Sequence, residues 1–384
     1  MILTNRKIYS YVRCVKLVLH TLLLMFLFAC QTDLETEVNQ QPQKFIHLEL
    51  ATGEAGLASV TGEVAYEQRI DNVIALVFNQ NNEFVYKAIS SEPKYDNSKR
   101  KYDIKVSLFE SENKEKYSVS LLVNPTKSTY TNFKVYEGKQ KEYVLKKLLY
   151  DSESDTDGKN YPWQKLENGI PMYGETDYKE ITSTTTFNTP VKLLRAVAKV
   201  DIFLNSEENN NEGSAVNYIL SEVHLFNSIT MGRIAPEMLH GAEQKNWERF
   251  IPSTPSMPSF DNNHKYNPSV LYKYGKVQST VLNPIMLAEN KGGIRGSSEE
   301  VTTFIIGLTP KDKLSNPKRY YRVDVVDATD DAHTAAILRN QYYKLLVRNV
   351  LGEGSDTPEE ALDSKDRCDA TLSIVPWKVQ KRDA

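Results

Sequence analysis

The sequence predicts an all-β protein with two β-sandwich domains in tandem, and three observations lead to this prediction. Many short segments alternate apolar and polar residues with the two-residue period of a half-buried strand. Turn-forming residues such as Asn, Gly and Pro separate these segments. The 384 residues include 22 Tyr, and aromatic side chains suit a half-buried pleated surface. A chain of this length is sufficient for roughly two or three domains.

The predicted elements follow one another from residue 45 onward. Residues 45–50 place an apolar side chain at every second position, which predicts the first strand. Residues 70–78 are a near-continuous apolar run, and a polar turn then leads into a strand at 84–89. The other expected strands lie at 102–109, 117–123, 190–204 (a pair), 301–308, 319–327, 341–348 and 370–379. Only short helices are expected, such as those at 110–116 and 358–362.

The first thirty residues differ in composition from the rest of the chain. Basic residues without any acid precede an apolar run at residues 17–29, and these basic residues are Arg6, Lys7, Arg13 and Lys16. The apolar run is shorter than the ~20 residues that a membrane-spanning helix needs. A short apolar run behind a cationic start is typical of a secretory signal peptide. The polar residues after this run, up to position 44, are expected to form a tether.

The end of the apolar run resembles a bacterial lipobox. It reads Leu27-Phe28-Ala29-Cys30, so cleavage would fall between Ala29 and Cys30 and leave Cys30 as an acylated N-terminus. The alternative is an ordinary signal peptide that is cut elsewhere, with Cys30 incidental. On the first interpretation, residues 1–29 are a lipoprotein signal peptide and residues 30–44 a tether. Each buried CH₂ of an acyl chain such as palmitate adds ~0.8 kcal/mol of membrane binding, so two chains hold the protein firmly.

Nothing in the sequence indicates an enzyme, a metal site or a bound cofactor other than this lipid. The formal net charge is −3, which gives no electrostatic reason to expect a nucleic-acid partner. No zinc-binding pair, nucleophile elbow or phosphate loop occurs. The segment 153–158 has the spacing of a calcium loop, but Gln164 stands where the bidentate acid is needed, so a solvated loop is favoured. The acidic residues at 324–331 are explained by a strand that ends in a polar turn.

The cysteines leave no intramolecular disulfide under the lipoprotein interpretation. Cys14 departs with the signal peptide, Cys30 carries the lipid, and Cys368 remains without a partner. Stability must therefore come from the apolar core.

An ordered set of motifs resembles the fimbrillins, lipoprotein-derived pilin subunits of Gram-negative anaerobes of the mouth and gut. The most specific part is the turn IPMYGE at residues 170–175, followed by PVKLLRAVAKVDIFL at 190–204. The remaining matches are at 287–290 (LAEN), 320–324 (YYRVD), 338–343 (LRNQYY) and 357–361 (TPEEA), and a last strand ends near Trp377. The resemblance covers essentially the whole chain, from the lipobox to the last strand.

The resemblance implies two transthyretin-like β-sandwich domains, at residues 45–195 and 196–384, and a structural subunit of a surface fimbria (a pilus) at the outer membrane. In that family a protease cuts behind the first strand of stalk subunits, and the vacated groove takes a C-terminal strand from a neighbouring subunit. An open sheet edge templates such an added strand. The partners are then other fimbrial subunits, the outer membrane through the lipid and, as a further class, host surface ligands. The donor strand here would be 370–379, with the side chains Leu372, Ile374, Val375 and Trp377.

Two alternatives stay open for these strands. Between Lys44 and Arg69 there is no Lys or Arg, so Arg69 is the next candidate cut site, directly before the apolar run 70–78. An uncut chain would keep its first strand and its lipid, as anchor subunits of the family do, so stalk and anchor roles are both compatible with the sequence. The terminal strand 370–379 either is donated to a neighbour or completes its own sandwich.

A function of another class also fits an all-β surface lipoprotein. Such β-sandwiches can bind glycans, which would need exposed Trp or Tyr rings that stack on sugars. Trp163, Trp247 and Trp377 are scattered along the sequence, and the 22 Tyr do not form a recognisable pattern. A surface glycan-binding lipoprotein is therefore the alternative to a fimbrial subunit.

Overall fold

The computed structural model describes residues 43–51, 66–99, 101–126, 129, 133–151, 169–204, 213–229, 231–237, 270–273, 285–294, 301–312, 317–326, 332–364 and 366–376. Residues 44–384 form one compact unit. The predicted signal peptide, Cys30 and most of the tether lie outside the described residues, as do the three Trp. Within the described part of the chain, no helix is both long and apolar enough to cross a membrane.

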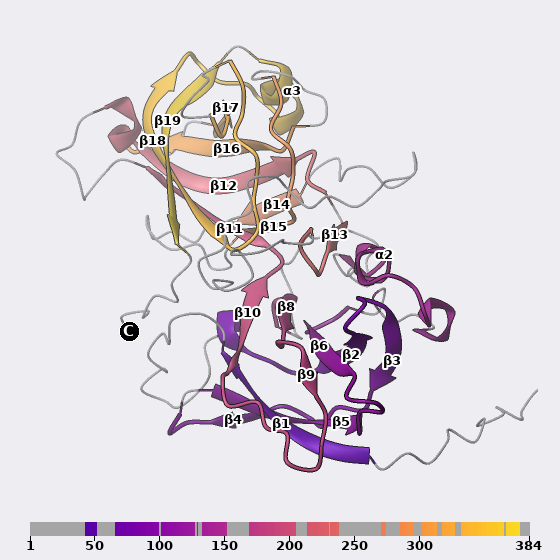
Figure 1. Cartoon of the computed structure of the whole chain (residues 1–384). Coiled ribbons are helices and arrows are strands. Elements are labelled where there is room, and N and C mark those ends of the chain that lie inside the picture. The colour runs from indigo at the N-terminus through magenta and orange to yellow at the C-terminus, as the bar shows by residue number, and fades with distance from the viewer. Residues whose placement is uncertain are drawn as a thin grey trace, which may run out of the picture. The chain divides into compact units, whose positions relative to one another are not determined.

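The first of two large sheets is built from the N-terminal half of the described chain (Figure 1). Its strands are β1 (Gln43–Ala51), β2 (Val73–Asn79), β3 (Phe84–Ala88), β4 (Lys94–Asp96), β5 (Lys101–Phe109), β6 (Lys116–Val123), β8 (Met172–Glu175), β9 (Lys179–Glu180) and β10 (Val191–Arg195). Their order is β3-β2-β6-β8-β10-β1-β5-β4, with β9 beside β6. The segment after β3 also bonds to β5, because the Ser107 N–H donates to the Ile89 carbonyl at 2.8 Å. The sheet therefore curls round on itself.

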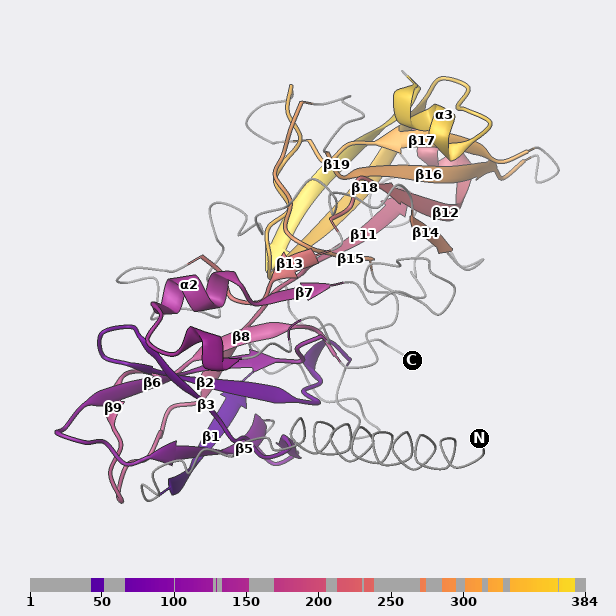
Figure 2. The ribbon, with the colours of Figure 1, turned by 90° about the vertical axis from the view of Figure 1, so that its right-hand side faces the viewer.

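The second large sheet contains the C-terminal strands. These are β11 (Ala198–Leu204), β12 (Tyr218–Phe226), β14 (Val270–Lys273), β15 (Ile285–Leu287), β16 (Thr303–Pro310), β17 (Arg319–Val323), β18 (Gln341–Leu351) and β19 (Arg367–Pro376). Their order is β14-β12-β16-β17-β19-β18-β11-β15. A separate pair joins β7 (Leu149–Asp151) to β13 (Met231–Arg233), and Figure 2 shows this pair close to the helix α2 (Lys141–Lys146). The other helical elements are α3 (Pro358–Asp363) and the 3₁₀ turns η1 (Tyr66–Gln68), η3 (Phe133–Tyr136) and η4 (Ser214–Asn217).

The two sheets enclose apolar cores, which confirms the predicted all-β, sandwich-like architecture. β11 alternates buried and half-buried side chains along its whole length, as a strand with one face on the core should. β10 ends at Arg195 in the first sheet, and β11 begins at Ala198 in the second. The core of the first sheet also includes side chains from the C-terminal half, such as Met286 and Tyr342. The division into two domains at 195/196 therefore stays a prediction.

Two short helices were predicted, and one of them is wrong. Residues 110–116 form a turn, because Asn113 and Lys114 adopt positive φ values of 50° and 62°, outside the range of a right-handed helix. The helix at 358–362 is confirmed as α3. The Glu360 N–H donates to the Thr357 hydroxyl at 3.2 Å, and Pro358 occupies the first turn, so α3 begins with a standard N-cap.

Candidate functional site

The first strand, β1, lies in the interior of its sheet rather than at an edge. It has β10 on one side and β5 on the other, and Leu50 and Ala51 lie opposite Val191 and Lys192 in a parallel pairing with β10. The inward side chains are almost completely buried, and they are Ile46, Leu48 and Leu50. Burial of each contributes about 1.5–3 kcal/mol. We call the space that β1 fills between β10 and β5 the β1 slot.

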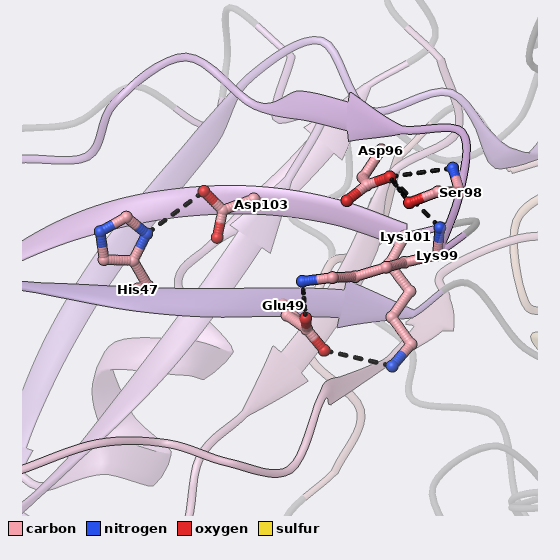
Figure 3. A network of polar contacts seen from close by, with 7 residues as sticks. All are labelled: His47, Glu49, Asp96, Ser98, Lys99, Lys101 and Asp103. Carbon is pink, nitrogen blue, oxygen red and sulfur yellow. Dashed lines mark hydrogen bonds and ion pairs between the residues drawn. The ribbon is translucent and has the colours of Figure 1, made fainter.

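The outward face of β1 is held by charged side chains of β5 and of the turn before it (Figure 3). The Glu49 carboxylate accepts hydrogen bonds from the Lys99 and Lys101 ammonium groups at 3.0 and 3.1 Å, which lowers the pKa of Glu49. His47 Nδ1 lies 3.3 Å from a carboxylate oxygen of Asp103. Position 47 meets 103 and position 49 meets 101, so the two strands run in opposite directions. The slot is thus apolar inside and charged outside.

Arg69, the candidate cut site, lies in a segment that is bonded to the fold. Its carbonyl accepts a hydrogen bond from the Asn124 side-chain amide at 2.8 Å, and its guanidinium donates to Asp71 at 2.9 Å. The Asp71 N–H donates to the Asn124 side-chain oxygen at 2.9 Å, and Ile70 is buried. Proteolysis favours exposed segments whose backbone is free. In the folded chain, a cut between Arg69 and Ile70 therefore needs this segment to open first.

The same segment is also bonded to the chain around β10 and β11. The Glu67 carboxylate accepts from the Lys199 ammonium at 2.6 Å, and the Glu67 carbonyl accepts from the Arg195 guanidinium at 3.3 Å. Burial lowers the pKa of Arg195 to about 10. Both cations belong to the segment 190–204, which carries the most specific part of the sequence resemblance. Their contacts hold Glu67, shortly before β2, in place.

The predicted donor strand is β19, and it pairs within its own sheet. It lies between β17 and β18, and its pairing with β18 runs from Gln341 opposite Pro376 to Leu351 opposite Arg367 (Figure 2). Leu372 packs half-buried against the C-terminal core, whereas Ile374 is 50% exposed. Val375 lies in the strand, and Trp377 lies outside the described residues. The strand completes its own sheet in this structure, and its donation to a neighbour stays a proposal.

Two segments of the sequence resemblance meet in a buried ion pair that sequence reasoning missed. The Arg339 guanidinium is fully buried and donates to the Glu289 carboxylate at 2.6 and 2.8 Å. It also donates to the backbone carbonyls of Ile234 and Arg233, at 2.8 and 2.9 Å. The motifs at 287–290 and 338–343 thus each supply one partner of this buried ion pair. Their separation along the chain gave no signal that they would pair.

A second polar cluster lies on and beside β12 and β17, around Glu222. Such a cluster is a candidate ligand site under the glycan-binding alternative. Burial alone would raise the pKa of Glu222, but hydrogen bonds from Lys318, Tyr320 and His224 outweigh it and lower this pKa to about 2. These three donors lie 2.8, 2.7 and 3.1 Å from the carboxylate oxygens. The Glu222 carboxylate already accepts hydrogen bonds from three side chains of this chain. We therefore interpret the cluster as a structural contact and not as a ligand site.

Of the acids in the two clusters of the sequence, only Asp324 lies among the described residues. In this part of the chain, no group of three or more His, Cys, Asp or Glu side chains is placed to hold a metal ion. Asp324 instead binds the buried Arg322 guanidinium at 2.7 Å. The calcium-loop pattern at 153–164 lies outside the described residues. Cys368 is buried in β19.

Comparison with known proteins finds similar structures at low sequence identity. A candidate cell adhesion protein from Bacteroides eggerthii superposes with a TM-score of 0.49 and 15% identity, covering 87% of this chain and 96% of that one. A fimbrial assembly protein from Parabacteroides distasonis gives a TM-score of 0.46 and 12% identity, covering 86% and 99% of the two chains. No protein-family model matches the sequence, and no curated protein matches it. At these identities and TM-scores, function has to be argued from the residues of this chain.

Proposed function

We propose that this chain is a structural subunit of a cell-surface fimbria that assembles by exchange of terminal β-strands between subunits, in a stalk or an anchor role. The observation that carries the proposal is the place of β1, which is the first strand of the described residues and lies in the interior of its sheet. Three of its side chains are buried in the core of the first sheet. A terminal strand can leave such a place without threading the chain through the fold.

The physical consequence of losing β1 supports strand exchange. Its departure would leave unpaired backbone N–H and C=O groups on both β10 and β5, and such groups template an added strand. It would also leave a groove that had enclosed Ile46, Leu48 and Leu50. Their burial contributes on the order of 5–9 kcal/mol, comparable with the whole stability of a typical domain. An empty slot is therefore unstable, and a neighbour's strand that fills it gains most of this free energy.

The two roles differ in whether β1 leaves. The hydrogen bonds of Arg69 and Asp71 to Asn124 support retention of β1 in the folded chain, which corresponds to an anchor. Opening of the segment 66–71 and a cut after Arg69 would correspond to a stalk subunit. In both roles the sequence supports delivery to the outer membrane, with a lipid on Cys30 and residues 30–44 as the tether.

At the C-terminal end, the proposal uses the outer half of β19. The strand is anchored in the core through Leu372 and Cys368, whereas Ser373 and Ile374 are exposed while still paired with β18. A neighbour can take the exposed end without opening the core of this sheet. The chain's own donation therefore involves the residues beyond Leu372, including Trp377.

Mass analysis of polymers from the cell surface tests the proposal. We expect the chain within these polymers to begin at acylated Cys30 in an anchor and at Ile70 in a stalk subunit. In Cys30→Ser, labelled palmitate should no longer enter the protein and the outer membrane should no longer retain it. Palmitate in Cys30→Ser would contradict the lipid assignment. Surface protein that is never part of a polymer would contradict the subunit role.

A further inference from the structure

The outward face of the β1 slot carries opposite charges in a fixed order. Along β5, Asp103 faces position 47 of β1 and Lys101 faces position 49. Lys99, in the turn before β5, reaches the same carboxylate as Lys101, so two ammonium groups converge on Glu49 (Figure 3). A strand that enters the slot meets a negative group at one outward position and two positive groups at the next.

The other features of the slot distinguish poorly between strands. Backbone hydrogen bonds to β10 and β5 are the same for every sequence except proline. The inner positions demand apolar side chains, but apolar side chains of similar volume replace one another at little cost. Charge at the outward positions does distinguish between strands, because a basic side chain opposite Lys99 and Lys101 is repelled. The charged groups of Lys99, Lys101 and Asp103 are therefore the part of the slot that can distinguish one incoming strand from another.

We infer that Lys99, Lys101 and Asp103 select the strand that enters the slot, and that the partner strand carries an acid at the position of Glu49. It carries a basic or neutral polar residue two positions earlier and apolar residues at the positions of Ile46, Leu48 and Leu50. This inference rests on the proposed strand exchange. The partner is an extended segment of a fimbrial subunit with this alternating pattern.

The chain's own terminal strand does not fit this pattern, so the partner is a different segment. Between the alternating residues 370, 372 and 374, β19 carries Thr371 and Ser373 and no acid. Aligning Asp369 with Glu49 instead would place Asp366 at the buried position of Ile46. A second copy of residues 367–376 is therefore a poor occupant of the slot.

Peptide exchange on the full chain tests the inference. The recognition sequence of a site-specific protease is inserted between residues 51 and 66, and cleavage then leaves β1 bound but no longer covalently attached. Fluorescent peptides with the sequence of residues 43–51 compete for the slot, as the native peptide, Glu49→Gln and Glu49→Lys. A His47→Lys peptide is the matched control, because it also adds a positive charge on the outward face but opposite Asp103 instead of the two lysines.

We expect the Glu49→Lys peptide to bind about tenfold more weakly than the native peptide at low salt, with Glu49→Gln between them. The His47→Lys control should bind at least as well as the native peptide, and added salt should reduce the difference between the native and Glu49→Lys peptides. On the double variant Lys99→Glu/Lys101→Glu, the Glu49→Lys peptide should bind better than the native one. Equal binding of the native, Glu49→Gln and Glu49→Lys peptides to the unchanged protein would overturn charge selection and leave exchange standing. Failure of every peptide to enter the slot would overturn strand exchange itself, and the inference with it.

Discussion

Deleting residues 370–384 is expected to destabilise the second sheet by on the order of 3 kcal/mol or more. The deletion removes Leu372 and Ala370 from the C-terminal core and takes away the pairing with β18 from Val347 to Gln341. The deletion therefore leaves the backbone of β18 from Gln341 to Val347 without its partner strand on that side, as an open sheet edge. Urea unfolding of the purified truncated chain measures the loss.

The shorter deletion of residues 377–384 is the matched control. It removes Trp377 and keeps all of the described pairing with β18, so its unfolding curve should lie closer to that of the full chain than the curve of the longer deletion. If this shorter deletion prevents polymer formation without changing the unfolding curve, residues 377–384 act in assembly and not in folding. A chain without 370–384 that unfolds like the full chain would show that β19 is dispensable to its own sheet.

Replacing Glu289 by Ala is expected to cost about 3–5 kcal/mol, because it leaves the Arg339 guanidinium as an uncompensated buried charge. The matched control is Asp356→Ala, which removes the carboxylate partner of Arg319 at an exposed ion pair. Exposed pairs contribute about 0–1 kcal/mol, so this control should scarcely change the free energy of unfolding. Urea unfolding of both variants gives the comparison.

A double variant separates the cost of the unpaired charge from the cost of lost packing. Glu289→Leu together with Arg339→Met removes both charges and keeps apolar bulk at the site, so it should be much more stable than Glu289→Ala. If the double variant and Glu289→Ala are equally destabilised, packing at this site matters more than charge. In that case the account of the buried pair is wrong.

Local sequence patterns were enough to predict the strands whose apolar residues follow a regular period or a continuous run. The alternation at 45–50 predicted β1, and the continuous apolar run at 70–78 predicted β2, because burial follows directly from side-chain period. β12 was missed, since a register shift between Leu220 and Glu222 breaks the two-residue period of its buried side chains. The expected helix at 110–116 is wrong because the polar composition of this segment does not reveal the positive φ values of Asn113 and Lys114.

The candidate site could be predicted only in part. The apolar residues of β1 and the place of Arg69 follow from the linear sequence, but the bonds of Arg69 to Asn124 join segments far apart in the chain. The same holds for Glu49 with Lys99 and for Glu289 with Arg339. Each of these contacts depends on which strand lies beside which, and a single segment does not carry that information.

Cross-linking within polymers is the direct test of whether subunits join through their terminal strands. A photoreactive amino acid replaces Lys192, which lies opposite Ala51 at the β1 slot, or Ile374 at the exposed end of β19. Polymers that contain isotopically light and heavy copies of this chain, together with the partner subunit whose strand enters the slot, then distinguish cross-links within a chain from those between chains. We expect cross-links between chains from position 192 in a stalk subunit and from position 374 in an anchor. Cross-links that stay within one chain at both positions would contradict joining through the terminal strands.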